Sequence, residues 1–146
     1  MTTTTLKEYL QTHSKNSVNN ESLHDKLVND VVAGLKRLIG DEPEEVYRKV
    51  ELIEENGAKI DRLDLVVLAS DEIYIIKTRN LSEDRRIGRG TGLNRMKQDL
   101  LRDYEFIKRR FEVISQMIAV YRNLGSRDFQ HYNVPRPLED LIASLK

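Results

Sequence analysis

Residues 63–78, LDLVVLASDEIYIIKT, decide the fold of this chain of 146 residues. They contain two apolar runs, LVVLA at 65–69 and IYII at 73–76, on either side of the polar turn Ser70-Asp71. β-branched and aromatic residues favour strands. A continuous apolar run such as LVVLA is typical of a strand that is buried on both faces. We therefore expect two neighbouring strands at the centre of a sheet.

The segment before these strands predicts a third one. VYRKVELIEENG at 46–57 ends in Asn56-Gly57, and Asn-Gly between two apolar runs is a strong hairpin signal. We therefore expect three consecutive antiparallel strands, a meander, over residues 46–79.

A helix is predicted before the meander, over residues 20–39. Asn19 or Asn20 suits its N-cap and Gly40 its end. Apolar residues recur there at steps of three and four, at Leu23, Leu27, Val31, Leu35 and Leu38. Residues 1–19 are polar and lack the basic start and apolar stretch of a secretory signal. We expect them to form a mobile arm with a short helical turn around Leu6–Leu10.

The second half of the chain predicts one helix and two strands. Helical spacing runs from 93 to 109, and FEVISQMIAVY at 111–121 has the β-branched content of a strand. The alternative is one long helix over 93–124. A short edge strand is expected at 129–134, followed by a short helix that begins at Pro135-Arg-Pro. The loop at 80–92 connects the meander to the helix.

This order of elements predicts a single domain over residues 20–146. A meander followed by a helical crossover gives an α/β (α+β) fold, with a mixed central sheet flanked by helices in the order α-β-β-β-α-β-β-α. The chain has no cysteine, which excludes disulfides, cysteine zinc sites and thiol nucleophiles. No apolar run is long enough to span a membrane, so we expect a cytoplasmic protein.

The formal net charge of zero conceals an uneven distribution. Residues 1–76 hold 9 basic and 15 acidic side chains, whereas residues 77–110 hold 11 basic and 5 acidic ones. A basic segment of this kind indicates an anionic partner. The alternative is two solvated faces that pair with each other.

The stretch LDLVVLASDEIYIIKTR and the order of the elements resemble the PD-(D/E)XK nuclease superfamily, which includes archaeal Holliday-junction resolvases and many restriction enzymes. In that family an acidic residue begins the second strand, and the third strand carries an acidic residue, an apolar residue and Lys. Asp64 and Lys77 match the first and last positions. The resemblance implies a restriction-endonuclease-like fold, Mg²⁺ or Mn²⁺ as cofactor, and hydrolysis of phosphodiester bonds in DNA or RNA.

The match is incomplete, because Ile75 stands where the family has its second carboxylate. A hard cation needs oxygen ligands, which Ile cannot supply. A metal ion bound by Asp64 would therefore need another ligand. We take Glu21, at the start of the first helix, as that ligand, with His24 as a weaker candidate. Asp64 and Lys77 are then the predicted catalytic residues. The alternative is that they form a structural ion pair.

The basic residues after Lys77 predict contacts with nucleic acid, DNA being favoured over RNA. Guanidinium and ammonium groups in a glycine-containing loop can follow phosphates. The predicted contacts are Arg79, Arg85, Arg86, Arg89, Arg95 and Lys97. Two further interpretations remain open: a nuclease-like protein that binds nucleic acid without cleaving it, and a dimeric assembly subunit. A homodimer is compatible with each.

Overall fold

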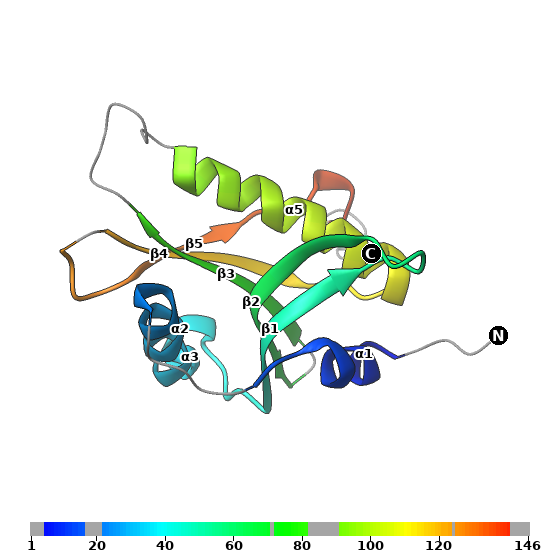
Figure 1. The fold of residues 1–146 in the computed structure, drawn as a ribbon, viewed down its shortest axis with the longest axis horizontal. Coiled ribbons are helices and arrows are strands. Elements are labelled where there is room, and N and C mark those ends of the chain that lie inside the picture. Colours follow the sequence, from blue (N-terminus) through cyan, green and yellow to red (C-terminus); the bar gives the residue numbers. More distant parts are fainter. Residues whose placement is uncertain (1–4, 17–21, 71, 82–90, 124, 141–146) are drawn as a thin grey trace.

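The computed structural model describes residues 5–16, 22–70, 72–81, 91–123 and 125–140. The described chain is a mixed α/β domain built on one five-stranded sheet in the order β1-β2-β3-β4-β5. Helices lie on both faces of this sheet (Figure 1). The predicted α/β class with a mixed sheet is therefore confirmed.

The first three strands form the predicted meander. β1 (Glu45–Ile53), β2 (Lys59–Ala69) and β3 (Glu72–Leu81) pair antiparallel in succession. The turn between β1 and β2 contains Gly57, whose φ of 90° is a conformation that glycine adopts without steric cost. The Asn-Gly signal thus identified the hairpin correctly.

The predicted crossover of a helix and a following strand is confirmed, although the strand begins at Gln116 rather than at residue 111. α5 (Thr91–Phe111) connects β3 to β4 (Gln116–Asn123), and these two strands are parallel. The helix ends where Glu112 adopts a φ of 56°, so one long helix over 93–124 is excluded. β5 (Gln130–Val134) is an antiparallel edge strand beside β4. Residues 138–140 are helical, and the rest of the predicted C-terminal helix lies outside the described residues.

The predicted helix over 20–39 is two helices in the structure. α2 (Leu23–Ala33) begins after Ser22, whose hydroxyl accepts a hydrogen bond from the Asp25 N–H, so the N-cap is neither Asn19 nor Asn20. α3 (Leu35–Ile39) follows after Gly34 and ends at Gly40, as predicted. The apolar spacing continues through Gly34, and for that reason it did not reveal the break.

The expected mobile arm at 1–19 needs a correction. Residues 6–13 form the helix α1 (Leu6–His13), whose Tyr9 and Leu10 are only 1% exposed. The Tyr9 hydroxyl donates to the Glu51 carbonyl at 2.7 Å and accepts from the Ile53 N–H at 2.8 Å. α1 is therefore a packed element that covers the edge of β1.

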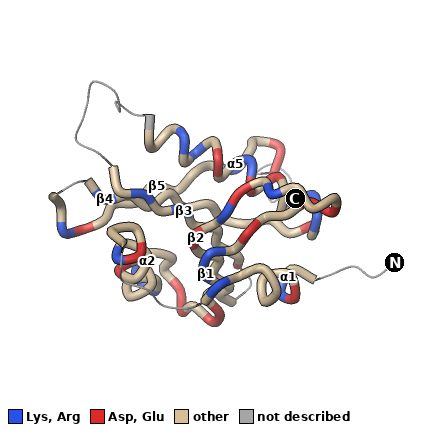
Figure 2. The backbone as a smooth tube through the Cα atoms, viewed as in Figure 1, with Lys and Arg blue, Asp and Glu red and all other residues tan. Residues whose placement is uncertain are grey.

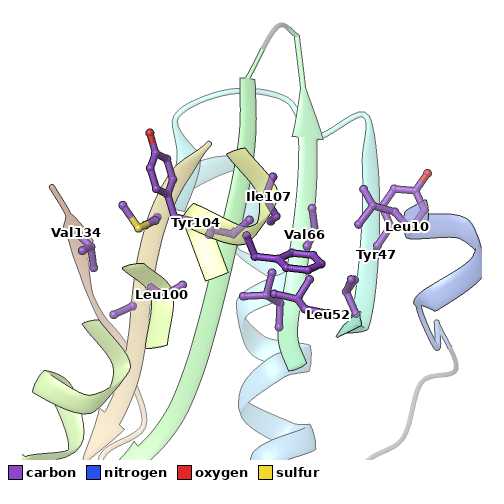
Figure 3. Close-up of a cluster of buried hydrophobic side chains, with 14 of the residues drawn as sticks. Leu10, Tyr47, Leu52, Val66, Leu100, Tyr104, Ile107 and Val134 are labelled. Carbon is purple, nitrogen blue, oxygen red and sulfur yellow. The ribbon is translucent and has the colours of Figure 1, made fainter. Parts of the chain in front are cut away.

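Two apolar clusters cover the two faces of the sheet. The larger one joins α1 and α5 to the sheet and includes Leu52, Val66, Leu100, Tyr104 and Ile107 (Figure 3). The smaller one joins α2 and α3 to the opposite face. We refer to these faces as the α5 face and the α2 face. No helix among the described residues is long and apolar enough to cross a membrane.

Candidate functional site

The candidate site lies where β2 and β3 stop pairing and separate, a point that we call the fork. β2 and β3 pair from Ala69–Glu72 only as far as Leu65–Ile76. Beyond that point β2 continues to Lys59 beside β1, whereas β3 continues to Leu81 beside β4. Asp64 and Lys77 are the first residues after the last pair. Beyond this point, β2 and β3 therefore lack the pairing with each other that a continuous sheet would provide.

At the fork, the alternation of β2 side chains between the two faces of the sheet is also interrupted. Leu63 belongs to the cluster of the α5 face, whereas Leu65, two residues later, belongs to that of the α2 face. In a regular strand, residues two apart share a face. Lys49, opposite Asp64 in the register of β1 and β2, has a φ of 51°, which is unfavourable for a residue with a side chain. The sheet is thus locally irregular at Asp64.

On the α2 face, Asp64 of β2 is hydrogen-bonded to β3 and α2 at the fork. It is 5% exposed, and its Oδ2 accepts a hydrogen bond of 2.7 Å from the Thr78 N–H. Its Oδ1 lies 3.2 Å from His24 Nε2, which is also 2.9 Å from Thr78 Oγ1. The hydrogen bond that His24 donates to the Asp64 carboxylate raises the pKa of His24 above its usual value, although burial opposes that shift. On the β2 side, where Thr78 has no strand partner, the Asp64 carboxylate therefore accepts the hydrogen bond from its N–H.

On the α5 face, three carboxylates surround the Lys77 ammonium group. Lys77 Nζ contacts Asp61 of β2 and lies 3.7 Å from Asp99 and 4.0 Å from Asp103, both on α5. Arg102 lies 3.2 Å from Asp61 and 3.4 Å from Asp99. We call Asp61, Asp99, Asp103 and Lys77 the fork cluster. It unites residues of β2, β3 and α5.

Asp103 is the unusual member of this cluster. It is 0% exposed, and neither of its carboxylate oxygens has a hydrogen-bond donor in the structure. Burial, together with the neighbouring Asp61, raises the pKa of Asp103 to about 9. Burial also disfavours the charged form of Asp61, but hydrogen bonds from Asp103 and Lys77 outweigh it and lower its pKa to about 2. The two carboxyl groups therefore share one proton at neutral pH.

An open hollow of about 560 Å³ lies at the fork. Residues of both faces line it, because the separated strands leave a gap between them. Its cationic lining comprises Lys59, Arg62, Lys77 and Arg79, and its acidic lining comprises Asp61, Asp64 and Asp99. This mixture can accept a phosphate group while retaining carboxylates for a cation.

The structure places the predicted catalytic residues in one hollow but on different faces. Asp64 interacts with His24 and Thr78, whereas Lys77 interacts with the carboxylates of the fork cluster. The alternative that Asp64 and Lys77 pair with each other is therefore wrong. Ile75 is 0% exposed within the α5-face cluster, so its position is part of the core.

The other predicted residues are only partly described. Glu21, Arg85, Arg86 and Arg89 lie outside the described residues. Arg79 and Arg95 are exposed, and the Lys97 ammonium group lies 4.1 Å from the ring centroid of Tyr132.

Sequence reasoning missed the carboxylates of α5. Asp99 and Asp103 are four residues apart and therefore share a face of the helix. Asp103 also lies on the buried side of α5 with Met96, Leu100 and Ile107. An acidic residue beside an apolar helical stripe was the available signal. That it approaches Lys77 depends on how α5 packs on the sheet.

The fork cluster has the donor atoms that a hard divalent cation requires. The buried oxygens of Asp103 lack donors, which is the state expected of groups that serve an additional ligand. Among the described residues, no set of three or more His, Asp or Glu side chains has the arrangement that holds a metal ion. In this structure the carboxylates are turned toward Lys77 and Arg102 instead.

Comparisons with known proteins give structural likenesses but no family. No protein-family model and no curated protein matches the chain. A solved structure described as "Crystal structure of SSO0001" aligns with 22% sequence identity and a TM-score of 0.44. The aligned region covers 84% of this chain and 56% of that one, so this chain spans little more than half the length of that protein.

Proposed function

We propose that this domain is a metal-dependent nuclease of PD-(D/E)XK type, with a restriction-endonuclease-like fold and its reaction centre at the fork. One observation supports the proposal: three carboxylates from two elements converge on Lys77 beside an open hollow. Asp61 and Asp99 line this hollow, and Asp103 is fully buried behind them without a hydrogen-bond donor. Burial of a carboxyl group costs free energy, and a bound cation would offset that cost for Asp103.

The roles follow from the positions of the side chains. Asp61, Asp99 and Asp103 would hold Mg²⁺ or Mn²⁺, so that α5 supplies the carboxylates that Ile75 does not. The bound ion would supply stabilisation of charge on the phosphate and a more acidic water. Lys77 neutralises charge on the phosphoryl group that enters the hollow. Arg62 and Arg79 bind the flanking phosphates. Asp64 is a positioning residue, because its contacts fix β3 relative to β2.

The proposal is tested with labelled single-stranded, duplex and branched DNA and with RNA, in Mg²⁺, Mn²⁺ or EDTA. We expect metal-dependent cleavage that falls by at least about 100-fold in Asp61→Asn and Lys77→Gln. Binding of Mn²⁺, measured by calorimetry without nucleic acid, should weaken in Asp61→Asn and Asp103→Asn. Asp30→Asn is the matched control, because Asp30 is exposed and pairs with Arg122 away from the fork.

Two results would overturn the proposal that the domain is a nuclease. One is no cleavage of any substrate in either metal. The other is equal cleavage by wild type and Asp61→Asn. Binding that weakens steeply with salt but proceeds without cleavage would establish the second candidate, an inactive nucleic-acid-binding protein. The observation that favours this candidate is the buried Ile75 in place of the family's carboxylate. If neither binding nor cleavage occurs, the assembly subunit remains, and its oligomeric state is then the quantity to measure.

A further inference from the structure

The two edge strands of the sheet differ in what covers them. On the β1 edge, backbone groups are bound by the segment that contains α1. In addition to the contacts of Tyr9, the Arg48 carbonyl accepts a hydrogen bond of 2.8 Å from the Lys15 N–H, and the Arg48 N–H donates one of 2.8 Å to Asn16 Oδ1. On the β5 edge, no strand among the described residues pairs with the outer side (Figure 1). An uncovered edge is a template for pairing with another chain.

β5 extends past the helices that cover the sheet. α5 packs on β2, β3 and β4, and α2 packs on β3. Residues 130–133, all but the last residue of β5, are exposed. Tyr132 is 39% exposed, and its ring centroid lies 4.1 Å from the Lys97 ammonium group. Within the described part of the chain, the outer side of β5 is therefore accessible to a further strand.

β5 also lacks the charged residues that prevent exposed edges from pairing. Its sequence QHYNV contains no Lys, Arg, Asp or Glu, and Figure 2 shows it without basic or acidic positions. Natural proteins place Lys or inward-pointing charges on an edge that must stay unpaired. The composition of β5 therefore favours an edge that does pair.

The charges that flank β5 are complementary to those of a second copy. Two identical antiparallel strands are related by a two-fold axis, so pairing of the whole strand places its middle residue, Tyr132, opposite its own copy. Asp128 stands two residues before the strand and Arg136 two residues after it. This register therefore places Asp128 of each copy opposite Arg136 of the other. Aromatic and opposite-charge pairs across strands both stabilise a sheet.

The covered β1 edge limits the symmetry of such an assembly. Head-to-tail pairing would join β5 of one copy to β1 of the next and would extend without limit. α1 and the segment after it occupy that edge, through hydrogen bonds of Tyr9, Lys15 and Asn16. Pairing of β5 with β5 uses one edge of each copy and closes as a dimer.

We propose that β5 is the dimerisation edge of this chain, and that its partner is β5 of a second copy, paired antiparallel with Tyr132 on the two-fold axis. The two five-stranded sheets then form one continuous sheet. A contact of one short strand is small, so the dimer is in reversible equilibrium with the monomer, with a dissociation constant on the order of 10 µM. This inference does not depend on the proposed cleavage.

Sedimentation velocity of the full chain tests the dimer. We expect the mass to rise from one chain to two between ~1 and ~500 µM protein. Tyr132→Lys places two like charges at the two-fold axis and should weaken dimerisation by at least about 10-fold. Hydrogen exchange should show that protection of β5 amides rises with protein concentration in wild type and not in Tyr132→Lys.

A charge exchange tests the register. Asp128→Arg and Arg136→Asp each replace two attractive contacts by two repulsive ones, so each variant alone should dimerise roughly 10-fold more weakly at low salt. An equimolar mixture of the two variants restores both opposite-charge contacts and should restore the dimer. Asp128 is exposed and lies outside the strand, so this variant decides the question even if Tyr132→Lys fails to fold.

Glu55→Arg is the matched control. It makes the same change of charge as Asp128→Arg, at an exposed residue between β1 and β2 on the other side of the sheet. It should dimerise as the wild type does. A wild-type chain that stays monomeric up to ~500 µM would overturn the inference, as would a dimer of equal affinity in wild type and Asp128→Arg. Failure of the mixture to restore the dimer would overturn the register.

Discussion

At the scale of single residues, the most informative group is the carboxyl of Asp103. An acid at 0% exposure can remain in the core only if it is neutral, paired or bound to a cation. Asp103 lies 4.0 Å from Lys77 and 3.8 Å from Arg102, which are long distances for ion pairs. Its raised pKa indicates the neutral form, with its proton directed to Asp61. The ion pair of Lys77 is therefore principally with Asp61.

This proton makes stability depend on pH. In the unfolded chain, residue 103 loses its proton near its ordinary value of 3.8, whereas the native state keeps it up to about pH 9. Between these values the native state binds more protons, so the free energy of unfolding falls as pH rises. The contribution of this group to the slope of the free energy of unfolding against pH approaches about 1.4 kcal/mol per pH unit. Asp103→Asn should remove it, as measured by urea denaturation at several pH values without metal.

The comparison between variants isolates this group. The pKa of His24 is also raised, so its stabilising contribution is present below pH 6.5 and is lost as pH rises through its folded pKa. That change is common to wild type and Asp103→Asn and cancels in their difference. Asp30→Asn should retain the wild-type slope. Parallel stability curves for wild type and Asp103→Asn would contradict the shared proton.

At the scale of elements, local pattern predicted types well and boundaries less well. The Asn-Gly turn and the apolar runs identified the three strands of the meander, because those signals act within a few residues. The break between α2 and α3 was missed, because Leu27, Val31, Leu35 and Leu38 keep helical spacing through it. The irregularity of β2 at Asp64 was also missed, since it depends on contacts with α2 and β3.

Gly34 and Gly40 provide a matched pair of substitutions for these helix ends. Gly34 has a φ of −105°, and a Cβ there would meet only ordinary contacts, the nearest with Phe129 at 3.6 Å. Gly34→Ala should therefore raise the free energy of unfolding by roughly 0.4–1 kcal/mol, through lower entropy of the unfolded chain. Gly40→Ala should lower it by about 1 kcal/mol, because its φ is 72°. Thermal denaturation measures both, and the same sign for the two variants would contradict this account.

At the scale of the whole molecule, α1 covers the edge of the sheet at β1 and completes the core. Its Tyr9 hydroxyl binds the edge of β1, and Tyr9 and Leu10 complete the cluster of the α5 face. Covering an edge strand removes a template for pairing with other chains. The polar composition of residues 1–19 concealed this role, because two buried residues in a short helix make a weak periodic signal.

Leu10→Ala tests whether α1 belongs to the fold. Leu10 is 1% exposed, so its truncation should lower the free energy of unfolding by about 2–5 kcal/mol in guanidinium denaturation. Leu23→Ala is the control, because Leu23 is 61% exposed and its loss should change stability by less than about 0.5 kcal/mol. An unchanged midpoint for Leu10→Ala would mean that the segment is a mobile arm after all.

Turn chemistry and apolar spacing act over a few residues, and they were enough to predict the strands, the crossover helix and the places of Asp64 and Lys77 on β2 and β3. The combination of the charged residues, in contrast, depends on how the elements pack. The fork separates Asp64 from Lys77, and the packing of α5 brings Asp99 and Asp103 to Lys77 beside Asp61. The physical reason is that alternation along a strand fixes faces only while pairing continues, and at the fork it stops.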